Sequence, residues 1–312
     1  MNNFFTCWPS LEAYAKRLSS KRFPGLFYYD YNPPGASEKP TLILIHGLGD
    51  EADTWRHIIP LLGEAGYRTL APDMPGFGRS LTSRRSSLSL HRNAVLELAE
   101  SVSGNSQNDF ILAGSSMGAA VAEAAALLLL QNHKSQTGQS ITIKALVLLD
   151  GCMPMESSGS PELLLAALPF AGKKWYRSFR TDPEKAWQSL FPYYADIHGL
   201  KEEDKAFLRK RVMDRVYSPS QERAFFSTLR SMIFQSLRSS YYRRIGSWPG
   251  KIALIWGEND KIIPKTLTES FVKLRIDKPT EISVIQGAGH LPHQEKPAET
   301  ANAIMGFLKT IG

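Results

Sequence analysis

The stretch DFILAGSSMGAAVAEAAALLLL, from Asp109 to Leu130, carries three structural signals in succession. An apolar run, Phe110 to Ala113, predicts a buried strand, and the Ala- and Leu-rich residues at the other end predict a helix. The turn between them reads G-x-S-x-G, in which small residues let strand and helix approach closely. Such a turn holds the hydroxyl of Ser116 above the sheet, at the positive end of the helix. Ser116 is therefore the candidate nucleophile, and a plain glycine turn is the alternative.

Short apolar runs alternate with segments of helical periodicity on both sides of this stretch. This alternation predicts a doubly wound, mostly parallel sheet with right-handed crossovers. The further strand-like runs are Leu26–Tyr31, Thr41–Ile45, Tyr67–Ala71, Ile143–Leu149, Lys251–Trp256 and Thr280–Ile285. The helix-like segments are Pro9–Ser19, Trp55–Gly63, Leu88–Val102, Thr266–Arg275 and Pro297–Thr310.

The alternation stops between Gly151 and Trp248. This region contains helical periodicity interrupted by prolines, and it carries 16 of the 32 aromatic residues. We therefore divide the chain into an α/β core, residues 1–150 and 249–312, and a helical insert, residues 151–248. The insert also holds 16 Lys and Arg against 10 Asp and Glu. The difference, +6, is most of the formal net charge of +7.

Composition restricts the class of protein. The chain has only two cysteines, Cys7 and Cys152, too few for a disulfide framework. It has no secretory leader and no apolar run of membrane-spanning length, so we expect a soluble, cytoplasmic protein without stable membrane insertion. The positive charge comes with no nucleic-acid motif and is best explained by solvated helix faces, with steering of anionic substrates as the alternative. No Cys/His cluster or Gly-rich phosphate loop predicts a metal or a cofactor.

A serine hydroxyl needs an adjacent base, and that base needs an orienting acid. Loops at the carboxyl ends of parallel strands meet at one edge of the sheet. Asp260 follows the strand ending at Trp256, and His290 follows the strand ending at Ile285. We therefore expect His290 to be the base and Asp260 the acid. The substitutes are His293 for the base, and Glu258 or Asp150 for the acid.

Two backbone amides are the candidates for the oxyanion hole. Met117 N–H starts the predicted helix, and Leu48 N–H lies in the glycine-flanked loop His46-Gly47-Leu48-Gly49. We expect His46 to hold this loop rather than to transfer protons. Asp73 is expected to fix its own loop, with Arg79 as a partner for its carboxylate.

Five motifs, in this order and at this spacing, resemble those of the α/β-hydrolase superfamily. They are HGLGD, PDMPGFGRS, GSSMGA, GENDKIIP and GAGHLPHQEKPAE, and together they span nearly the whole chain. The resemblance implies an α/β-hydrolase fold of about eight strands in which residues 151–248 form a helical lid. It also implies that Ser116, Asp260 and His290 match the catalytic triad, and that Leu48 and Met117 match the oxyanion positions.

The resemblance gives less information about the substrate. A serine nucleophile differs from the aspartate of the branches similar to haloalkane dehalogenases and epoxide hydrolases. The meta-cleavage C–C hydrolases are similar in DMPGFGRS and SSMG, but that branch tends to carry Asn where this chain has Ser115 and Thr54. We expect a carboxylesterase acting on a small apolar ester. A C–C hydrolase, a lactonase or a thioesterase on the same triad is the alternative, and a ligand-binding protein without turnover is the alternative of another class.

The aromatic residues of the insert have two interpretations. They could line an apolar acyl pocket, with Trp175, Trp187 and Phe226 as examples. They could equally form the small core with which the lid packs on the sheet domain.

Overall fold

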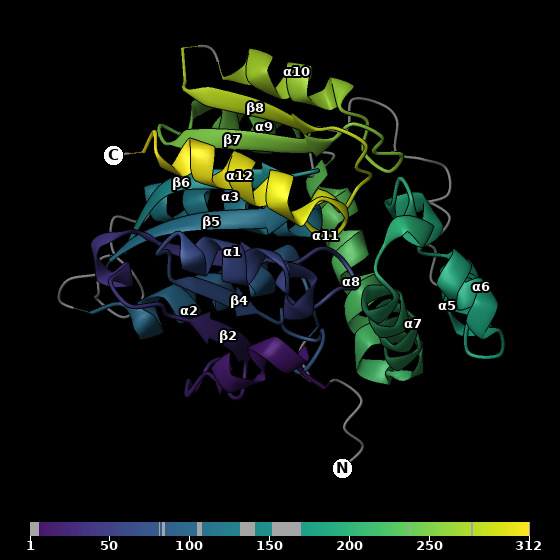
Figure 1. Ribbon diagram of the computed structural model, residues 1–312. Coiled ribbons are helices and arrows are strands. Elements are labelled where there is room, and N and C mark those ends of the chain that lie inside the picture. The colour runs from purple at the N-terminus through teal and green to yellow at the C-terminus, as the bar shows by residue number, and fades with distance from the viewer. Residues whose placement is uncertain are drawn as a thin grey trace.

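The computed structural model describes residues 6–80, 82, 85–104, 108–131, 141–151, 170–236, 238–275 and 277–311. Cys152 and the first part of the predicted lid, residues 152–169, lie outside this range. The described residues form an α/β core with a group of helices beyond one edge of its sheet (Figure 1).

The centre of the core is an eight-stranded sheet with the order β1-β2-β4-β3-β5-β6-β7-β8. Strands β3 to β8 pair in parallel, whereas β1 pairs with β2, and β2 with β4, in antiparallel register. The mostly parallel, doubly wound sheet predicted from the sequence is therefore confirmed. The strands are β1 (Ala15–Arg17), β2 (Phe27–Tyr31), β3 (Thr41–Ile45), β4 (Thr69–Pro72), β5 (Asp109–Ser115), β6 (Thr142–Leu149), β7 (Lys251–Gly257) and β8 (Thr280–Ile285).

Helices cover both faces of this sheet, because its central strands are apolar on both sides. All five residues of β3 are buried. Helices α1 and α12 contribute to the apolar cluster on one face, and α2, α3, α9 and α10 contribute to the cluster on the other. The helices of the core are α1 (Ile58–Glu64), α2 (Leu88–Val102), α3 (Met117–Gln131), α9 (Ser239–Ser247), α10 (Thr266–Leu274), α11 (Pro292–Glu295) and α12 (Pro297–Leu308).

The lid helices lie beside α11, to the right of the sheet in Figure 1. They are α5 (Ala171–Ser178), α6 (Pro183–Gln188), α7 (Glu202–Tyr217) and α8 (Pro219–Ser236). The sequence placed the end of the lid at Trp248, but α9 packs against α3 and α10. Its residues Tyr242 and Ile245 are buried in the apolar cluster of the sheet. We therefore describe α5 to α8 as the lid and α9 as part of the core.

The N-terminal segment differs from its prediction. The sequence predicted an amphipathic helix over Pro9–Ser19, whereas the structure has a 3-10 helix over Pro9–Tyr14 followed by strand β1. The reason is a long-range pairing, because Ala15 to Arg17 form the antiparallel edge next to β2. Tertiary contacts of this kind override a weak local helix preference.

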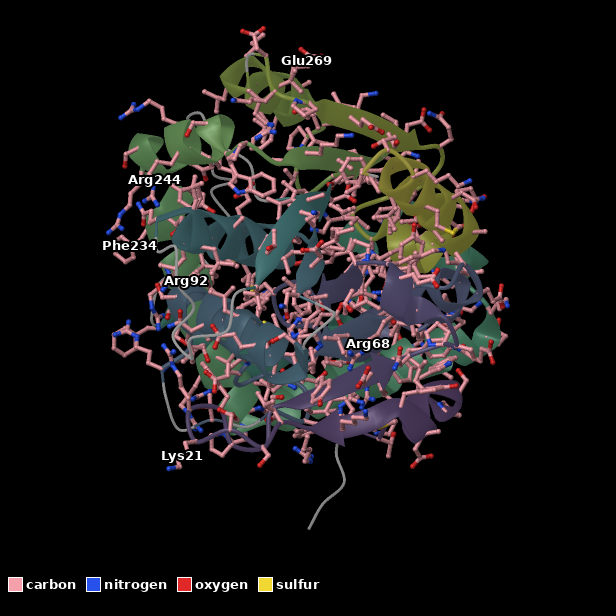
Figure 2. All side chains as sticks on the ribbon, turned by 90° about the vertical axis from the view of Figure 1, so that its left-hand side faces the viewer. Lys21, Arg68, Arg92, Phe234, Arg244 and Glu269 are labelled. Carbon is pink, nitrogen blue, oxygen red and sulfur yellow. The ribbon has the colours of Figure 1, made fainter. Side chains whose placement is uncertain are left out.

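Figure 2, which draws the side chains as sticks, shows long side chains projecting from the helices, among them Phe234 of α8 and Arg244 of α9. Phe234 is 67% exposed. Within the described part of the chain, no helix combines the length and the apolar character needed to span a bilayer.

Candidate active site

Ser116 lies at the sharp turn between β5 and α3. Its φ of 53° is in the left-handed region, which is rare for a residue other than glycine and stores strain. The turn is held from below, because Ser116 N–H donates to the carbonyl of Leu149, at the end of β6, over 2.9 Å. The serine is therefore presented at the carboxyl edge of the sheet in a fixed backbone conformation.

Two glycines make this turn possible. A Cβ on Gly118 would lie 2.1 Å from the carbonyl oxygen of Ile45, and a Cβ on Gly114 would lie 2.2 Å from the backbone of Gly118. Both distances are far below van der Waals contact, so no larger residue fits without movement of the backbone. The first turn of α3 thus packs backbone to backbone against β3 and β5, as the G-x-S-x-G pattern predicts.

The loops after β7 and β8 bring Asp260 and His290 together. His290 Nδ1 lies 2.9 Å from Asp260 Oδ2, and both side chains are buried. The other oxygen, Asp260 Oδ1, accepts the backbone N–H groups of Ile262 and Ile263. A carboxylate facing Nδ1 favours the tautomer with the proton on Nδ1, which leaves Nε2 as an acceptor. This is the protonation state that a general base requires.

The loop after β3 lies directly against the serine. A Cβ on Gly47 would be 3.6 Å from Ser116 Cβ, so the segment carrying Leu48 borders the turn that carries Met117. Met117 is the first residue of α3, where N–H groups have no partner within the helix. His46 Nε2 accepts the N–H of Met74 over 2.8 Å, and its Nδ1 donates to the carbonyl of Gly47. His46 therefore holds the loop, which is the structural role expected from the sequence.

A buried ion-pair network continues this loop into lid helix α7. Arg215 contacts Asp50 and Glu51 over 2.6 and 3.0 Å, and Arg211 contacts Glu51 and Asp53 over 3.2 Å each. Burial by itself would raise the pKa of Glu51, but Arg215 and Arg211 lower that pKa to about 2. The sequence assigned the lid arginines to solvated helix faces, and for these two that interpretation was wrong.

Asp73 and Arg79 form a separate part of the same network. Arg79 Nε lies 2.7 Å from Asp73 Oδ2, and Arg79 also pairs with Asp53 over 2.8 Å. Asp73 further accepts the backbone N–H of Ala52. The expected pairing of Asp73 with Arg79 is thus present, and its role is to fix the loops.

Asp150 follows β6, which separates β5 from β7 in the sheet, so it lies between the loops that carry Ser116 and Asp260. Its Oδ1 accepts the N–H of Gly257 over 2.8 Å, whereas its Oδ2 is buried without a hydrogen-bond donor in the described structure. Burial and the nearby Asp260 carboxylate raise the pKa of Asp150 well above its ordinary value. The raised pKa favours the neutral acid form of Asp150, which can donate a hydrogen bond toward Asp260.

Asp150, Asp260 and His290 are also the described residues whose ligand atoms approach the spacing of a metal site, within 4.8 Å of one another. His290 Nδ1 is already hydrogen-bonded to Asp260, and a metal would have to replace that proton. The arrangement fits the orientation of a histidine better than the coordination of an ion.

The other substitutes proposed from the sequence make structural contacts. His293 Nε2 lies 2.8 Å from the hydroxyl of Thr54, and burial lowers the pKa of His293 to about 3. Glu258 accepts the N–H of Gly287 and so braces the loop that leads to His290.

The lid aromatics named from the sequence divide into two groups. Trp187 and Phe226 are 1% exposed and belong to the small apolar clusters of the lid, whereas Trp175 is 46% exposed. Two other lid aromatics lie against the loops that carry His290 and Gly49. The ring of Tyr193 is 5.8 Å from that of His290, and Phe225 would be 3.2 Å from a Cβ on Gly49.

The fold, the strained serine turn and the buried His–Asp pair define the class of hydrolases built on a mostly parallel sheet. The model of the alpha/beta hydrolase family matches residues 42–303. The chain belongs to this family.

Relatives cover almost the whole chain. It is 24% identical over 288 residues to the uncharacterized hydrolase YugF of Bacillus subtilis, an alignment that spans 91% of this chain and 94% of YugF. It is 25% identical over 299 residues to epoxide hydrolase 3 of Xenopus tropicalis, spanning 90% and 74% of the two chains. Among solved structures, it superposes on the 2-hydroxy-6-oxo-6-phenylhexa-2,4-dienoate hydrolase of Rhodococcus sp. with a TM-score of 0.71 and 20% identity, over 91% and 94% of the chains.

Proposed function

We propose that this hydrolase cleaves carboxylic esters of small apolar molecules through an acyl-enzyme, with Ser116, His290 and Asp260 as its triad. The observation that carries the proposal is the buried 2.9 Å contact between His290 Nδ1 and Asp260 Oδ2, at the sheet edge where the strained Ser116 also lies. That contact leaves Nε2 unprotonated for the serine proton.

The reaction follows from these roles. His290 Nε2 takes the proton of Ser116 as Oγ attacks the ester carbonyl, and the carbonyl π electrons move to oxygen. Collapse of the tetrahedral intermediate breaks the bond to the alcohol, which leaves with the proton from His290. Water then attacks the acyl-serine with His290 again as base, and a second collapse releases the acid and restores Ser116. Asp260 stabilises the imidazolium formed in each half.

The negative oxygen of the intermediate needs donors that are already in place. We assign them to Met117 N–H, at the start of α3, and Leu48 N–H, in the loop that His46 holds. Loss of one such donor costs about 3 kcal/mol, or two to three decades in rate. Because Arg211 and Arg215 join this loop to α7, the lid helps to keep the second donor in position.

An ester is favoured over a C–C substrate by two positions. Meta-cleavage hydrolases tend to carry Asn where this chain has Thr54 and Ser115. Thr54 is 2% exposed and its hydroxyl is taken up by His293 and Gln294, so it cannot reach a substrate. Ser115 is fully buried. Neither residue supplies the polar substrate contact that an exposed Asn would give.

A matched pair of variants tests the proposal. A fluorophosphonate probe should label the wild-type protein and the Ser115→Ala variant, but not Ser116→Ala, because only Ser116 lies at the strained turn. Hydrolysis of short p-nitrophenyl esters should fall by several decades in Ser116→Ala and persist in Ser115→Ala. A ligand-binding protein without turnover would hydrolyse none of the esters in any form. Unchanged hydrolysis in Ser116→Ala would refute the proposal outright.

A substrate series tests which bond is cleaved and how long an acyl group the site accepts. Esters of increasing chain length measure the depth of the acyl site, and matched lactones and thioesters compare leaving groups on the same acyl group. Turnover of a meta-cleavage dienoate with no ester turnover would assign the same residues to C–C hydrolysis instead.

A further inference from the structure

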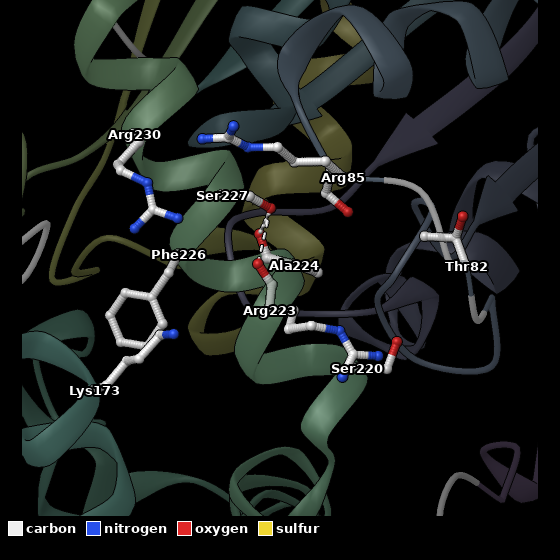
Figure 3. Close-up of a pocket in the computed structure, with 10 residues that line it drawn as sticks. Thr82, Arg85, Lys173, Ser220, Arg223, Ala224, Phe226, Ser227 and Arg230 are labelled. Atoms are coloured by element: carbon white, nitrogen blue, oxygen red, sulfur yellow. Dashed lines mark hydrogen bonds between the residues drawn. The ribbon is translucent and has the colours of Figure 1, made fainter. Parts of the chain in front are cut away.

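A cavity of about 260 Å³ lies between lid helix α8 and the segment that follows the Asp73–Arg79 loop (Figure 3). One wall is the face of α8 that carries Ser220, Arg223, Ser227 and Arg230. The opposite wall includes Thr82, Arg85 and Ser86, and Lys173 of α5 joins the lining. This volume is at the lower end of the range for ligand pockets and suits a small molecule or a head group.

Four of the lining side chains are cations, and none of the lining residues is acidic. Arg223 and Arg230 are seven residues apart, so they project from the same face of α8. Figure 3 shows Arg85 extending across this helix toward Arg230. Like charges that converge on one hollow repel one another, and a bound anion removes that cost.

The contrast with neighbouring lid arginines makes this cluster unusual. Arg177 and Arg180 both pair with Glu222, each over 2.7 Å, and Arg211 and Arg215 pair with carboxylates of the core. In the described part of the chain no salt bridge joins Arg85, Arg223, Arg230 or Lys173 to a carboxylate. The charge of Lys173 acts in part on Glu222, whereas the charges of Arg85, Arg223 and Arg230 are available to a ligand.

Both walls of the cavity are held by hydrogen bonds. Ser86 Oγ donates to the carbonyl of Pro75, and the hydroxyl of Thr228 on α8 lies 2.9 Å from His91 Nε2 on α2. Burial lowers the pKa of His91 to about 3, so this contact joins neutral groups. The guanidinium groups thus extend from fixed backbone, which lowers the entropic cost of binding.

We propose that this pocket binds a phosphate group carried by a small organic molecule, held by Arg85, Arg223 and Arg230. The planar guanidinium fork matches phosphate oxygens in pairs, which a lysine cluster would not do. Phe226 and Ala224 add an apolar surface for the organic part of the ligand. The site is separate from the candidate triad, and it assigns a function to part of the positive charge of the lid.

Calorimetry at fixed ionic strength tests the site with inorganic phosphate and with glycerol 3-phosphate. We expect saturable binding of glycerol 3-phosphate, weakened at least about tenfold in Arg223→Gln/Arg230→Gln, because two charge-assisted partners are lost. The control is Arg238→Gln/Arg244→Gln, which removes the same charge from the surface at α9, where Arg244 points into solvent (Figure 2). Its affinity should equal that of the wild type.

An experiment with vesicles distinguishes a lipid head group from a soluble phosphate ester as the source of the phosphate. Flotation with phosphatidylcholine vesicles, with and without phosphatidylglycerol, supports a lipid head group if capture needs both phosphatidylglycerol and the pocket arginines. Binding of free glycerol 3-phosphate without vesicle capture supports a soluble phosphate ester.

Two results would overturn the proposal: no saturable binding of any probe, or equal weakening in both double variants, which would mean that only the overall charge matters. Thermal unfolding checks that each variant folds. If Arg223→Gln/Arg230→Gln does not fold, the same titrations on Arg85→Gln, which lies outside the helix, decide the question.

Discussion

Replacing Asp260 with Asn changes one atom in the buried pair with His290. The Asn oxygen can keep the N–H groups of Ile262 and Ile263, which Asp260 Oδ1 now accepts. Its amide N–H₂ would then face His290 Nδ1 and donate to it. The imidazole proton would move to Nε2, which could no longer take a proton from Ser116.

The size of the effect follows from the geometry. Two unit charges separated by the 2.9 Å between Nδ1 and Oδ2 interact by about 6 kcal/mol at an effective dielectric constant of about 20. That is the stabilisation of the imidazolium that Asp260 supplies in the transition state. Its loss predicts a fall of about four decades in kcat for Asp260→Asn.

Asp150 gives this prediction a second part. In Asp260→Asn the neighbouring negative charge that helps to raise the pKa of Asp150 is gone. The Asp150 carboxyl lies within 4.8 Å of the His290 imidazole. A buried acid with a raised pKa becomes charged only as pH rises. The residual activity of Asp260→Asn should therefore increase with pH, and Asp150→Asn/Asp260→Asn should lack that increase. Asp150→Asn alone keeps an acceptor for Gly257 N–H and should lose little activity.

The assay is the pH profile of kcat for a p-nitrophenyl ester, corrected for spontaneous hydrolysis, in the wild type and these three variants. Activity of Asp260→Asn within about tenfold of the wild type would refute the assignment of the orienting acid. A profile of Asp260→Asn identical to that of the double variant would refute the part assigned to Asp150.

Three further predictions concern stability. Gly118→Ala should lose about 2–3 kcal/mol in the free energy of unfolding, measured in urea, because its Cβ would lie 2.1 Å from Ile45 O. Glu123 is buried, with a pKa raised to about 8, so its folded form prefers the neutral acid. Its contribution is full below the unfolded pKa and is lost as pH rises through about 8, by up to about 5 kcal/mol, and Glu123→Gln should abolish this pH dependence of urea unfolding. Arg215→Gln leaves the buried Glu51 with less compensation, so we expect a loss of about 3–5 kcal/mol by thermal unfolding, together with lower kcat.

Each of these changes has a control that the same chain provides. Gly306→Ala in α12 has nothing within 4 Å of its new Cβ and should stabilise by up to about 1 kcal/mol. Glu269→Gln on the exposed face of α10 should leave the pH dependence unchanged (Figure 2). Arg209→Gln breaks an exposed pair with Glu184 and should cost at most about 1 kcal/mol. Equal losses in a test variant and its control would contradict the burial argument for that site.

Local patterns were sufficient to predict most of the core. The strand Thr41–Ile45 and the helix Leu88–Val102 have the predicted bounds. A short, fully apolar run favours a buried strand, and apolar residues at helical spacing favour an amphipathic helix. The loops carrying Ser116, Asp260 and His290 could be placed on one edge because parallel strands end together.

Pairings between segments far apart in the chain could not be predicted from local sequence patterns. The edge strand β1 depends on β2, and the sequence of Ala15 to Arg17 has no strand signal of its own. Arg211 and Arg215 look like ordinary surface residues of a basic helix, yet their partners in the core are more than 150 residues away. The sequence gives no local indication of which basic residues of the lid are buried.

The pairing of α7 with the loop at Asp50 to Asp53 limits how the lid of this enzyme can be exchanged with that of another hydrolase. The two arginines and three carboxylates are complementary only as a set. A chimera that receives the lid of another hydrolase, but retains its own loop, would bury acids without their counter-ions. Exchange of the loop together with the helices should preserve both stability and turnover, because the two segments have to be exchanged together.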